Sequence, residues 1–260
     1  MNSLTNITHL IIDMDGVLYL GDKPMPRLCD FIYFLRTRPV QFILATNNST
    51  RTPQEYVNKL AGMGVTVSSD EILVSGQATA RYLAREYPRG TRVHVFGMPA
   101  LRQALVEEGF ALADENVQLV VASMDRNITY EKLKMASLLI QGGARFIATN
   151  LDPTNPSEEG LLPGTGSMIK ALEAASGVKP TAIGKPEPIM YQLAMAQMGA
   201  RPETTAIIGD RVDTDILGGK RAGLMTICVL SGSSNRDEAA EADLVFNDIA
   251  HLLDTWSRLG

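Results

Sequence analysis

A buried strand that ends in two carboxylates constrains this chain more than any other feature. Leu10–Ile12 is short and apolar, which is typical of a strand buried on both faces, and it runs into Asp13, Met14, Asp15 and Gly16. Desolvated anions are costly unless they are paired or bound to a cation. Because α/β folds bind ligands at the carboxyl ends of parallel strands, the pattern indicates a chemical site at Asp13 and Asp15; a solvated Asp/Gly turn is the alternative.

Strands and helices alternate along the chain in an order that predicts an α/β fold with a parallel sheet. The predicted strands are Leu10–Ile12, Gln41–Ala45, Ile72–Val74, Val93–Phe96, Leu119–Ala122, Phe146–Thr149, Thr181–Gly184, Thr205–Ile208, Thr226–Val229 and Leu244–Phe246. Apolar residues at helical spacing separate several of them, such as Leu28, Ile32 and Leu35 after the first strand.

A break near residues 82–90 separates the first β/α series from a second one. Because the second series has its own alternation, we expect residues 82–180 to form an inserted α/β domain, and residues 1–81 with 181–260 to form a core domain. Within the insert, Pro153–Gly166 is rich in Pro, Gly and Ser and is predicted to be a long loop.

Net charge and cysteine content limit the binding partners and the cellular compartment that can be expected for this protein. The 260 residues carry a net charge of -5, which argues against nucleic acid as the main partner because phosphate backbones bind basic surfaces. No apolar run approaches the thickness of a bilayer and Met1–Asn6 lacks a basic start, so we expect no signal peptide and no membrane partner. Cys29 and Cys228 lack metal-type spacing and are expected to be reduced thiols, as in a cytoplasmic protein.

Polar side chains suited to one site follow several of the predicted strands. They are Asp13 and Asp15, Thr46 and Asn47, Lys185 after the strand at 181–184, and Asp210 after the strand at 205–208. In a parallel sheet these strand ends meet at one edge. Carboxylates there can hold a hard cation such as Mg²⁺, while a hydroxyl, an amide and an ammonium can hold phosphoryl oxygens. One aspartate can then attack phosphorus.

Four motifs at these positions stand in a recognisable order. They are Asp13–Val17, Thr46–Ser49, Gly184–Pro186, and Gly209-Asp210 with Asp215. In this order the chain resembles the haloacid dehalogenase (HAD) superfamily of phosphotransferases. Ala148-Thr149-Asn150, Pro163–Gly166 and the place of the insert make it similar to the NagD-like, p-nitrophenyl phosphatase and pyridoxal-phosphate phosphatase branch. The resemblance implies a Rossmann-like core with helices on both faces of its sheet, and an α/β cap that closes over the site and selects the substrate.

The resemblance also implies a role for each residue. Asp13 would be the nucleophile that forms an aspartyl-phosphate, and Asp15 the general acid and then the general base. Mg²⁺ would be held by the Asp13 carboxylate, the Asp15 backbone carbonyl and Asp210, with Asp215 orienting metal-bound water. The phosphoryl oxygens would be held by Thr46, Asn47, Asn48 and Lys185. The implied activity is Mg²⁺-dependent hydrolysis of small phosphomonoesters.

Some of these residues also allow a purely structural interpretation. Asn48 and Ser49 can shape a turn, and Asp213 is expected to be solvated or to cap a helix. Asn150 and Asp152 are either turn formers or part of a substrate loop. The long loop at 153–166 is the candidate for contact with the leaving group. Its Gly164-Thr165-Gly166 end lacks the Gly-x-Gly-x-x-Gly pattern, so no dinucleotide site is predicted.

Two other functions remain in competition with the phosphatase. A phosphomutase uses the same scaffold, whereas Asp15 argues against a dehalogenase. A non-catalytic sensor that binds a phosphorylated metabolite and uses cap closure as a switch is the alternative from another class. In each case the expected partner is a small phosphorylated metabolite. The sequence leaves the oligomeric state open, a homodimer included.

Overall fold

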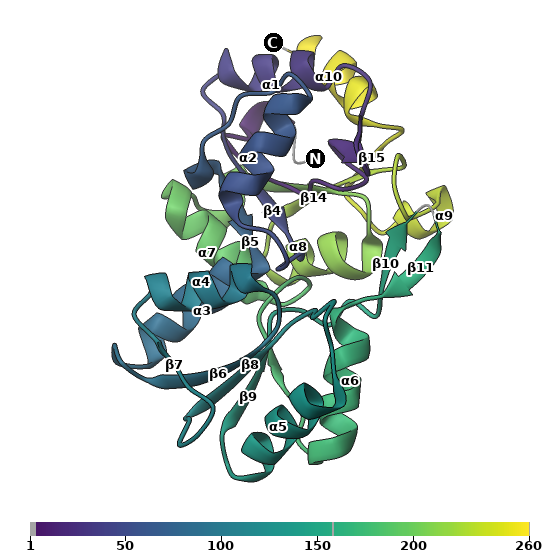
Figure 1. Cartoon of the computed structure of the whole chain (residues 1–260). Coiled ribbons are helices and arrows are strands. Elements are labelled where there is room, and N and C mark those ends of the chain that lie inside the picture. Colours follow the sequence, from purple (N-terminus) through teal and green to yellow (C-terminus); the bar gives the residue numbers. More distant parts are fainter. Residues whose placement is uncertain (1–3, 158, 260) are drawn as a thin grey trace. The chain divides into compact units, whose positions relative to one another are not determined.

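The computed structural model describes residues 4–157 and 159–259 (Figure 1), which form two compact units. The first unit comprises Met1–Thr46, Pro53–Leu73 and Lys185–Gly260, and the second comprises Asn47–Thr52 and Val74–Gly184. The predicted insert, 82–180, lies inside the second unit. The first three residues of the N-terminal stretch and residue 158 of the predicted loop lie outside the described residues.

A six-stranded sheet forms the centre of the first unit. Its spatial order is β15 (Leu244–Phe246), β14 (Met225–Val229), β13 (Thr205–Gly209), β1 (His9–Ile12), β4 (Gln41–Thr46) and β5 (Ile72–Val74). β1 pairs in parallel with β13 and β4, and β14 pairs in parallel with β13 and β15. Leu10, Ile11 and Ile12 are buried, as expected for a strand covered on both faces. The predicted parallel α/β core is confirmed.

Helices of the first unit pack against this sheet. They are α1 (Leu28–Arg36), α2 (Pro53–Gly62), α7 (Pro188–Met198), α8 (Leu217–Arg221), α9 (Arg236–Ala239) and α10 (Ile249–Ser257). α1 buries Leu28, Phe31, Ile32 and Leu35 and contacts α10, while α7 contacts β1 and β4. Short 3₁₀ turns lie at Leu4–Asn6, Ser69–Glu71 and Pro202–Thr204, and β2 (Tyr19–Leu20) pairs with β3 (Lys23–Pro24) in a small hairpin.

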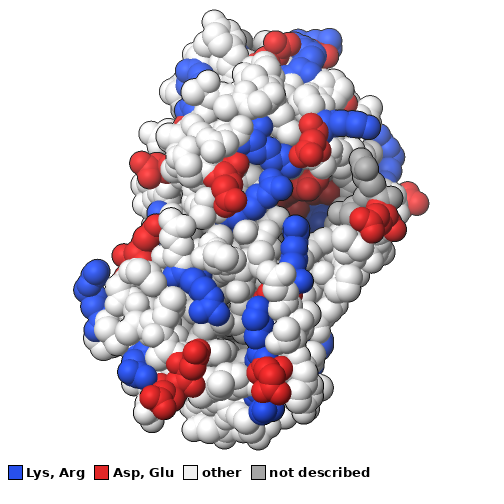
Figure 2. All heavy atoms as spheres, in the orientation of Figure 1, with Lys and Arg blue, Asp and Glu red and all other residues white. Residues whose placement is uncertain are grey.

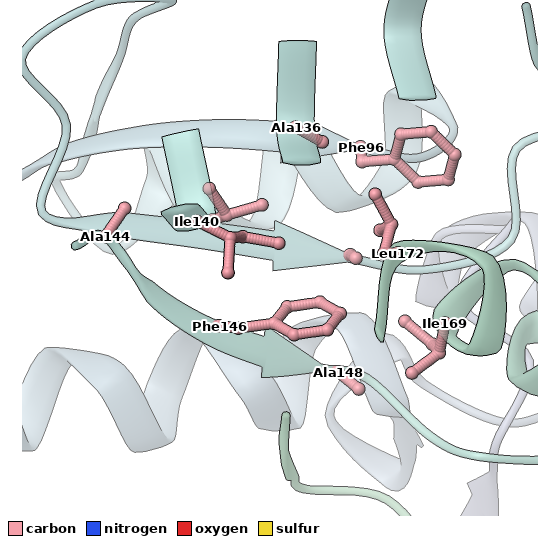
Figure 3. Close-up of a cluster of buried hydrophobic side chains, with 10 residues drawn as sticks. Phe96, Ala136, Ile140, Ala144, Phe146, Ala148, Ile169 and Leu172 are labelled. Carbon is pink, nitrogen blue, oxygen red and sulfur yellow. The ribbon is translucent and has the colours of Figure 1, made fainter. Parts of the chain in front are cut away.

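The second unit has a five-stranded parallel sheet and its own core. The spatial order is β12 (Thr181–Ala182), β9 (Arg145–Ala148), β8 (Leu119–Ala122), β6 (Arg92–Phe96) and β7 (Ala111–Leu112). The helices are α3 (Ser75–Glu86), α4 (Pro99–Glu107), α5 (Tyr130–Gln141) and α6 (Thr165–Ser176). Side chains from β6, β8, β9, α5 and α6 form one buried apolar cluster, in which Phe96, Phe146, Ile140, Ile169 and Leu172 meet (Figure 3). This unit therefore has the sheet, the helices and the hydrophobic core of an α/β fold.

Two sequence predictions about the second unit were wrong. The strand predicted at 181–184 is β12, which pairs with β9 in the second sheet, so Lys185 does not follow a strand of the core sheet. Apolar patterning identifies a strand but not the sheet that it joins. The predicted long loop contains a hairpin instead, β10 (Thr154–Ser157) with β11 (Gly160–Pro163). Proline is tolerated in edge strands, and both strands of a two-stranded sheet are edges, so Pro156 does not prevent pairing.

Four helices were not predicted from the sequence. α3 runs through Glu86, into the stretch interpreted as a break, the short helices α8 and α9 follow β13 and β14, and α10 follows the last strand. None of the helices among the described residues is long and apolar enough to span a bilayer. On the face shown in Figure 2, acidic and basic side chains are interspersed.

Candidate active site

Asp13 stands where β1 ends and the chain turns. Its backbone N–H still donates to Ile208 O at 2.8 Å, as in the strand, and its side chain is buried. The turn that follows has Gly16 at φ +85°, a backbone conformation that glycine adopts without strain. A Cβ at Gly16 would lie 2.5 Å from Asp210 Cγ, so glycine is required here for space as well.

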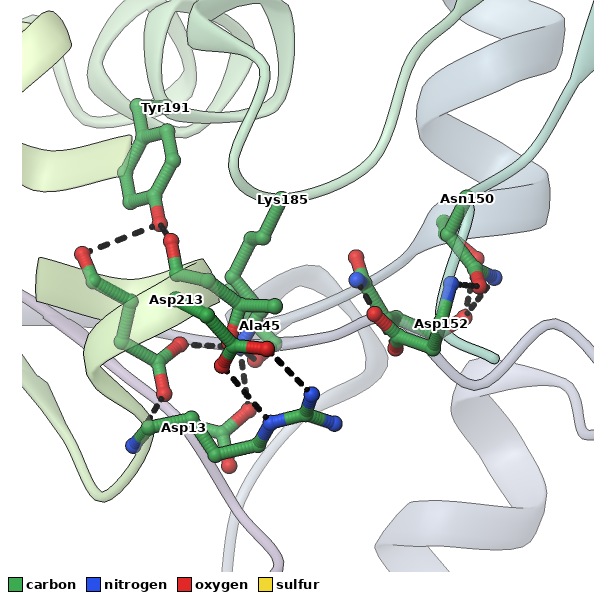
Figure 4. Close-up of polar contacts among 12 residues, drawn as sticks. Asp13, Ala45, Asn150, Asp152, Lys185, Tyr191 and Asp213 are labelled. Carbon is green, nitrogen blue, oxygen red and sulfur yellow. Dashed lines mark hydrogen bonds and ion pairs between the residues drawn. The ribbon is translucent and has the colours of Figure 1, made fainter. Parts of the chain in front are cut away.

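Lys185 connects two of the predicted acidic residues (Figure 4). Its buried ammonium donates to Asp13 Oδ1, to Asp215 Oδ1 at 2.7 Å and to Ala45 O at 3.3 Å. Burial opposes the charged form, but the carboxylates of Asp13 and Asp215 outweigh it and raise the pKa of Lys185. The ammonium is therefore held charged inside the protein. The contact between Lys185 and Asp215 was not predicted.

Three buried carboxylates gather at this point. Asp13, Asp210 and Asp215 each present an oxygen within 4.8 Å of the others. With Lys185 they carry a formal charge of -2, from three anions and one cation. Burial raises the pKa of Asp13, the charges of Asp215 and Asp210 add to this, and Lys185 opposes it. Such a set of oxygen donors with two uncompensated charges fits a hard divalent cation.

A loop after β14 holds Asp210 in place. Ser233 N donates to Asp210 Oδ2 at 2.7 Å, and a Cβ at Gly232 would lie 2.0 Å from the same oxygen. Ser231 Oγ donates to Gly16 O at 2.7 Å, which ties the loop to the turn after Asp13. Burial, followed by the charge of Asp215, raises the pKa of Asp210 to about 6. This loop was not predicted from the sequence, although a Gly/Ser cluster at a predicted strand end was its signal.

Asp215 is fixed by a π-helical turn, Val212–Ile216. Its Oδ2 accepts from Arg211 N at 3.1 Å, so its two oxygens face a backbone N–H and the Lys185 ammonium. Tyr191 Oη donates to the backbone carbonyls of Thr214 and Asp215 at 3.0 and 3.2 Å. Single π-helical turns are frequent at functional sites.

Asp213, in the same turn, is exposed and pairs with the guanidinium of Arg211, as close as 2.8 Å. It lies on the surface and takes no part in the acidic cluster.

Asp15 lies in different surroundings from Asp13. Asp15 is solvent-exposed, yet partial desolvation by the surrounding protein raises the pKa of its carboxyl. The charge of Lys59 and hydrogen bonds from the N–H groups of Gly21 and Gly16 lower this pKa, but by less. Lys59 Nζ donates to Gly21 O at 2.7 Å and lies 4.0 Å from the centre of the Tyr19 ring. A raised pKa in an accessible carboxyl suits a group that exchanges protons.

The predicted phosphate-binding segment begins at the end of β4. Thr46 is buried in the first unit, and Asn47, the next residue, is buried in the second. Asn48 Oδ1 accepts from Thr50 N at 2.9 Å and from Thr50 Oγ1 at 2.7 Å, so Asn48 shapes a turn. The roles assigned to these side chains from the sequence stay predictions.

The comparisons with known proteins agree with the motif analysis. A family model described as haloacid dehalogenase-like hydrolase matches residues 10–111, and a second, HAD-hydrolase-like, matches residues 182–252. Among curated relatives, 5'-nucleotidase YutF of Bacillus subtilis is 38% identical and the match covers 89% of this chain and 90% of that one. Dihydroxyacetone phosphatase of Corynebacterium glutamicum is 40% identical, with 96% and 92% covered.

Comparison with solved structures identifies the branch of the family that the chain resembles. The p-nitrophenyl phosphatase of Archaeoglobus fulgidus has a TM-score of 0.90 at 32% identity, covering 96% of this chain and 99% of that one. NagD of E. coli has a TM-score of 0.88 at 33% identity, with 94% and 97% covered. Glycerol phosphate phosphatase Rv1692 of Mycobacterium tuberculosis, solved with magnesium, has a TM-score of 0.88 at 32% identity, with 95% and 76% covered. The resemblance found in the motifs is confirmed: the chain belongs to the haloacid dehalogenase-like hydrolases, in the branch of NagD and the p-nitrophenyl phosphatases.

Proposed function

We propose that the protein hydrolyses small phosphomonoesters through a phosphoenzyme formed on Asp13. The observation that carries this proposal is the buried contact between Asp13 and the Lys185 ammonium, within a cluster that also contains Asp210 and Asp215. A carboxylate is a weak nucleophile towards an anionic phosphate unless charge is compensated nearby. Lys185 supplies one positive charge beside Asp13.

We further propose that Mg²⁺ is the resident cation. The Asp13 and Asp210 carboxylates, with the Asp15 backbone carbonyl, would hold it. Asp215 would not contact the ion directly but would orient water bound to it. Its formal charge matches the -2 of the cluster, and its preference for oxygen ligands matches the donors. When bound, Mg²⁺ would neutralise charge on the transferring phosphoryl group.

The chain's own residues would perform two steps. In the first, an Asp13 oxygen attacks phosphorus, the bond from phosphorus to the ester oxygen breaks, and Asp15 gives its proton to that oxygen. In the second, Asp15 takes a proton from water, which attacks phosphorus and releases inorganic phosphate with Asp13 restored. The raised pKa of Asp15 supports this use, because a donor must hold its proton at the working pH.

The substrate class is proposed from the relatives' names, which include a 5'-nucleotidase, an acid sugar phosphatase and a dihydroxyacetone phosphatase. Their shared feature is a small organic group esterified to one phosphate. We propose the same class here, with the second unit acting as the cap that selects among such esters. The cytoplasmic location and a homodimer stay proposals from the sequence.

A phosphomonoester panel with Mg²⁺ tests this function. Wild-type protein should release phosphate from p-nitrophenyl phosphate and from some metabolite esters. Asp13→Asn should abolish release, because its amide cannot attack phosphorus, whereas the matched variant Asp237→Asn, on the exposed face of α9, should keep wild-type turnover. Retained turnover in Asp13→Asn would overturn the nucleophile assignment. Failure of the wild type on the whole panel would favour the metabolite sensor.

A further inference from the structure

Asn47, at the start of the second unit, is held by three side chains. Its backbone carbonyl accepts from Ser75 Oγ at 2.6 Å and from Asn150 Nδ2 at 2.7 Å. Its own side-chain Nδ2 donates to Asp152 Oδ2 at 3.0 Å. Ser75 and Asn150 are almost completely buried. Both the backbone and the amide of Asn47 are therefore fixed.

The residues that hold Asn47 are themselves constrained. Asp152 N donates to Asn150 Oδ1 at 3.1 Å, which forms a tight turn between the two (Figure 4). Gly166 N donates to Asp152 O at 2.8 Å, and a Cβ at Gly166 would lie 2.2 Å from Leu151 O. The Gly164-Thr165-Gly166 motif thus lets the first turn of α6 press against the backbone of residues 151–152. This gives the motif a structural use that the sequence left open.

Chain connectivity links this arrangement to two predicted phosphate-binding residues. Asn47 follows Thr46 directly, and consecutive Cα atoms are about 3.8 Å apart. Gly184 precedes Lys185 directly, and a Cβ at Gly184 would lie 2.6 Å from Asn47 Oδ1. Asn47 is therefore close in space to the covalent neighbour of Lys185 and is itself the covalent neighbour of Thr46.

The partner of the Asn47 amide is a carboxylate, and this determines how the amide points. An ionised carboxylate only accepts hydrogen bonds, so it selects the NH₂ end of the amide and turns the oxygen end away. A hydrogen bond to a charged acceptor is also stronger than one to a neutral group. A hydroxyl in the place of Asp152 could both donate and accept, and would therefore permit either orientation of the Asn47 amide. The Asp152 carboxylate permits only one.

We propose that Asp152, supported by Asn150, is a positioning residue: by accepting one Nδ2–H of Asn47, it orients the amide so that the second Nδ2–H can donate to a phosphoryl oxygen. This inference rests on the proposed phosphatase function and adds a residue to it. It predicts an effect common to all substrates, because every phosphomonoester presents the same phosphoryl group. A residue that contacted the leaving group would instead affect some esters and spare others.

The test compares Asp152→Ala, Asp152→Asn and the control Asp114→Ala on three esters: p-nitrophenyl phosphate, glycerol phosphate and a nucleoside monophosphate. Asp114 is a carboxylate of the same unit that is 74% exposed and pairs with His94 at 2.9 Å. Asp152→Ala should lower kcat/KM between about 10- and 100-fold on every ester, the range for a misplaced binding group. Asp152→Asn should recover most of it, since its Oδ1 can accept from Asn47, and Asp114→Ala should match the wild type.

Binding of inorganic phosphate in the presence of Mg²⁺, measured by calorimetry, gives a second readout that needs no turnover. Asp152→Ala should weaken it by about the same factor, and Asp152→Asn should restore it. The proposal is overturned by a loss confined to one ester, by wild-type behaviour of Asp152→Ala, or by equal losses in both variants with lowered melting temperatures. If the wild type hydrolyses no ester, the phosphatase function fails, but phosphate binding still decides the role of Asp152.

Discussion

The carboxylate of Asp210 lies directly against the backbone of Gly232, where a Cβ would come within 2.0 Å of Oδ2. With the N–H of Ser233 on the same oxygen, the loop after β14 fixes the direction of one of the three clustered carboxylates. The proposed cation binding at this cluster would therefore depend on a loop that carries no acidic side chain of its own among residues 231–234.

Gly232→Ala should weaken Mg²⁺ binding because the added methyl group displaces Asp210. We expect the Mg²⁺ concentration for half-maximal activity to rise about 10- to 100-fold, as for other groups that orient a ligand. Gly62→Ala is the matched control, since a Cβ there meets no atom within 4 Å. An unchanged Mg²⁺ requirement in Gly232→Ala would show that Asp210 is not a ligand or that the loop yields.

Lys185→Met should destabilise the protein as well as inactivate it. It removes the ammonium and leaves the Asp13 and Asp215 carboxylates buried without their cation. Removing one partner of a buried ion pair costs about 3–5 kcal/mol of unfolding free energy, which urea denaturation at pH 8 without Mg²⁺ would measure. Lys170→Met, which breaks an exposed pair with Glu173, should change stability little. Equal effects of the two substitutions would contradict the role of Lys185.

The stabilisation by Mg²⁺ should grow with pH. The pKa of Asp210 is raised from 3.8 to about 6, so the folded protein binds a proton more tightly than the unfolded chain does. The stability that this proton contributes is complete below pH 3.8 and is lost as the pH rises through about 6. Mg²⁺ competes with that proton, so its effect should be larger at pH 8 than at pH 5.

Calorimetric melting in Mg²⁺ and in EDTA measures this difference at each pH. A ligand at 100 times its dissociation constant stabilises by about 2.7 kcal/mol. Asp210→Asn should remove most of the Mg²⁺ effect at both pH values. A Mg²⁺-induced shift of equal size at pH 5 and pH 8 in the wild type would argue against protonation of the cluster.

Asp15→Asn should separate the two chemical steps. p-Nitrophenolate leaves without a proton, so the first step should proceed, while the second lacks its general base. We expect one equivalent of p-nitrophenolate per enzyme in a rapid burst, followed by turnover reduced about 10²- to 10⁴-fold. Glycerol phosphate, whose alkoxide needs a proton, should give no burst. Steady turnover of both esters at the wild-type rate would remove Asp15 from the mechanism.

The sequence predicted the residues of the acidic cluster better than it predicted the contacts among them. Asp13 and Asp210 follow strands that neighbour each other in the sheet, so their residue types and positions were informative. Two contacts join segments that are distant in the chain: the pairing of Lys185 with Asp215, and the hydrogen bond from the 231–234 loop to Asp210. Local sequence patterns do not encode such contacts. The roles of these residues stay predictions until the variants are measured.

The fold was predicted where apolar patterns were strong. The strands of three or more residues in both sheets contain buried apolar side chains, and all of them were predicted. Thr181–Ala182 was assigned to the wrong sheet because a two-residue strand carries no information about its neighbours. The hairpin of β10 and β11 was hidden by its Pro and Gly residues, and its β11 side chains are exposed, so no alternation marked it.

The attachment of Lys185 limits how this enzyme can be shortened. The lysine lies three positions after β12, whose hydrogen bonds to β9 belong to the second sheet. A minimal catalytic fragment, made by replacing residues 75–184 with a flexible linker, would keep α2, β5 and every acidic residue of the cluster. It would nevertheless lose the strand that tethers the ammonium-bearing segment, so excision would have to supply a new anchor as well as a new connection.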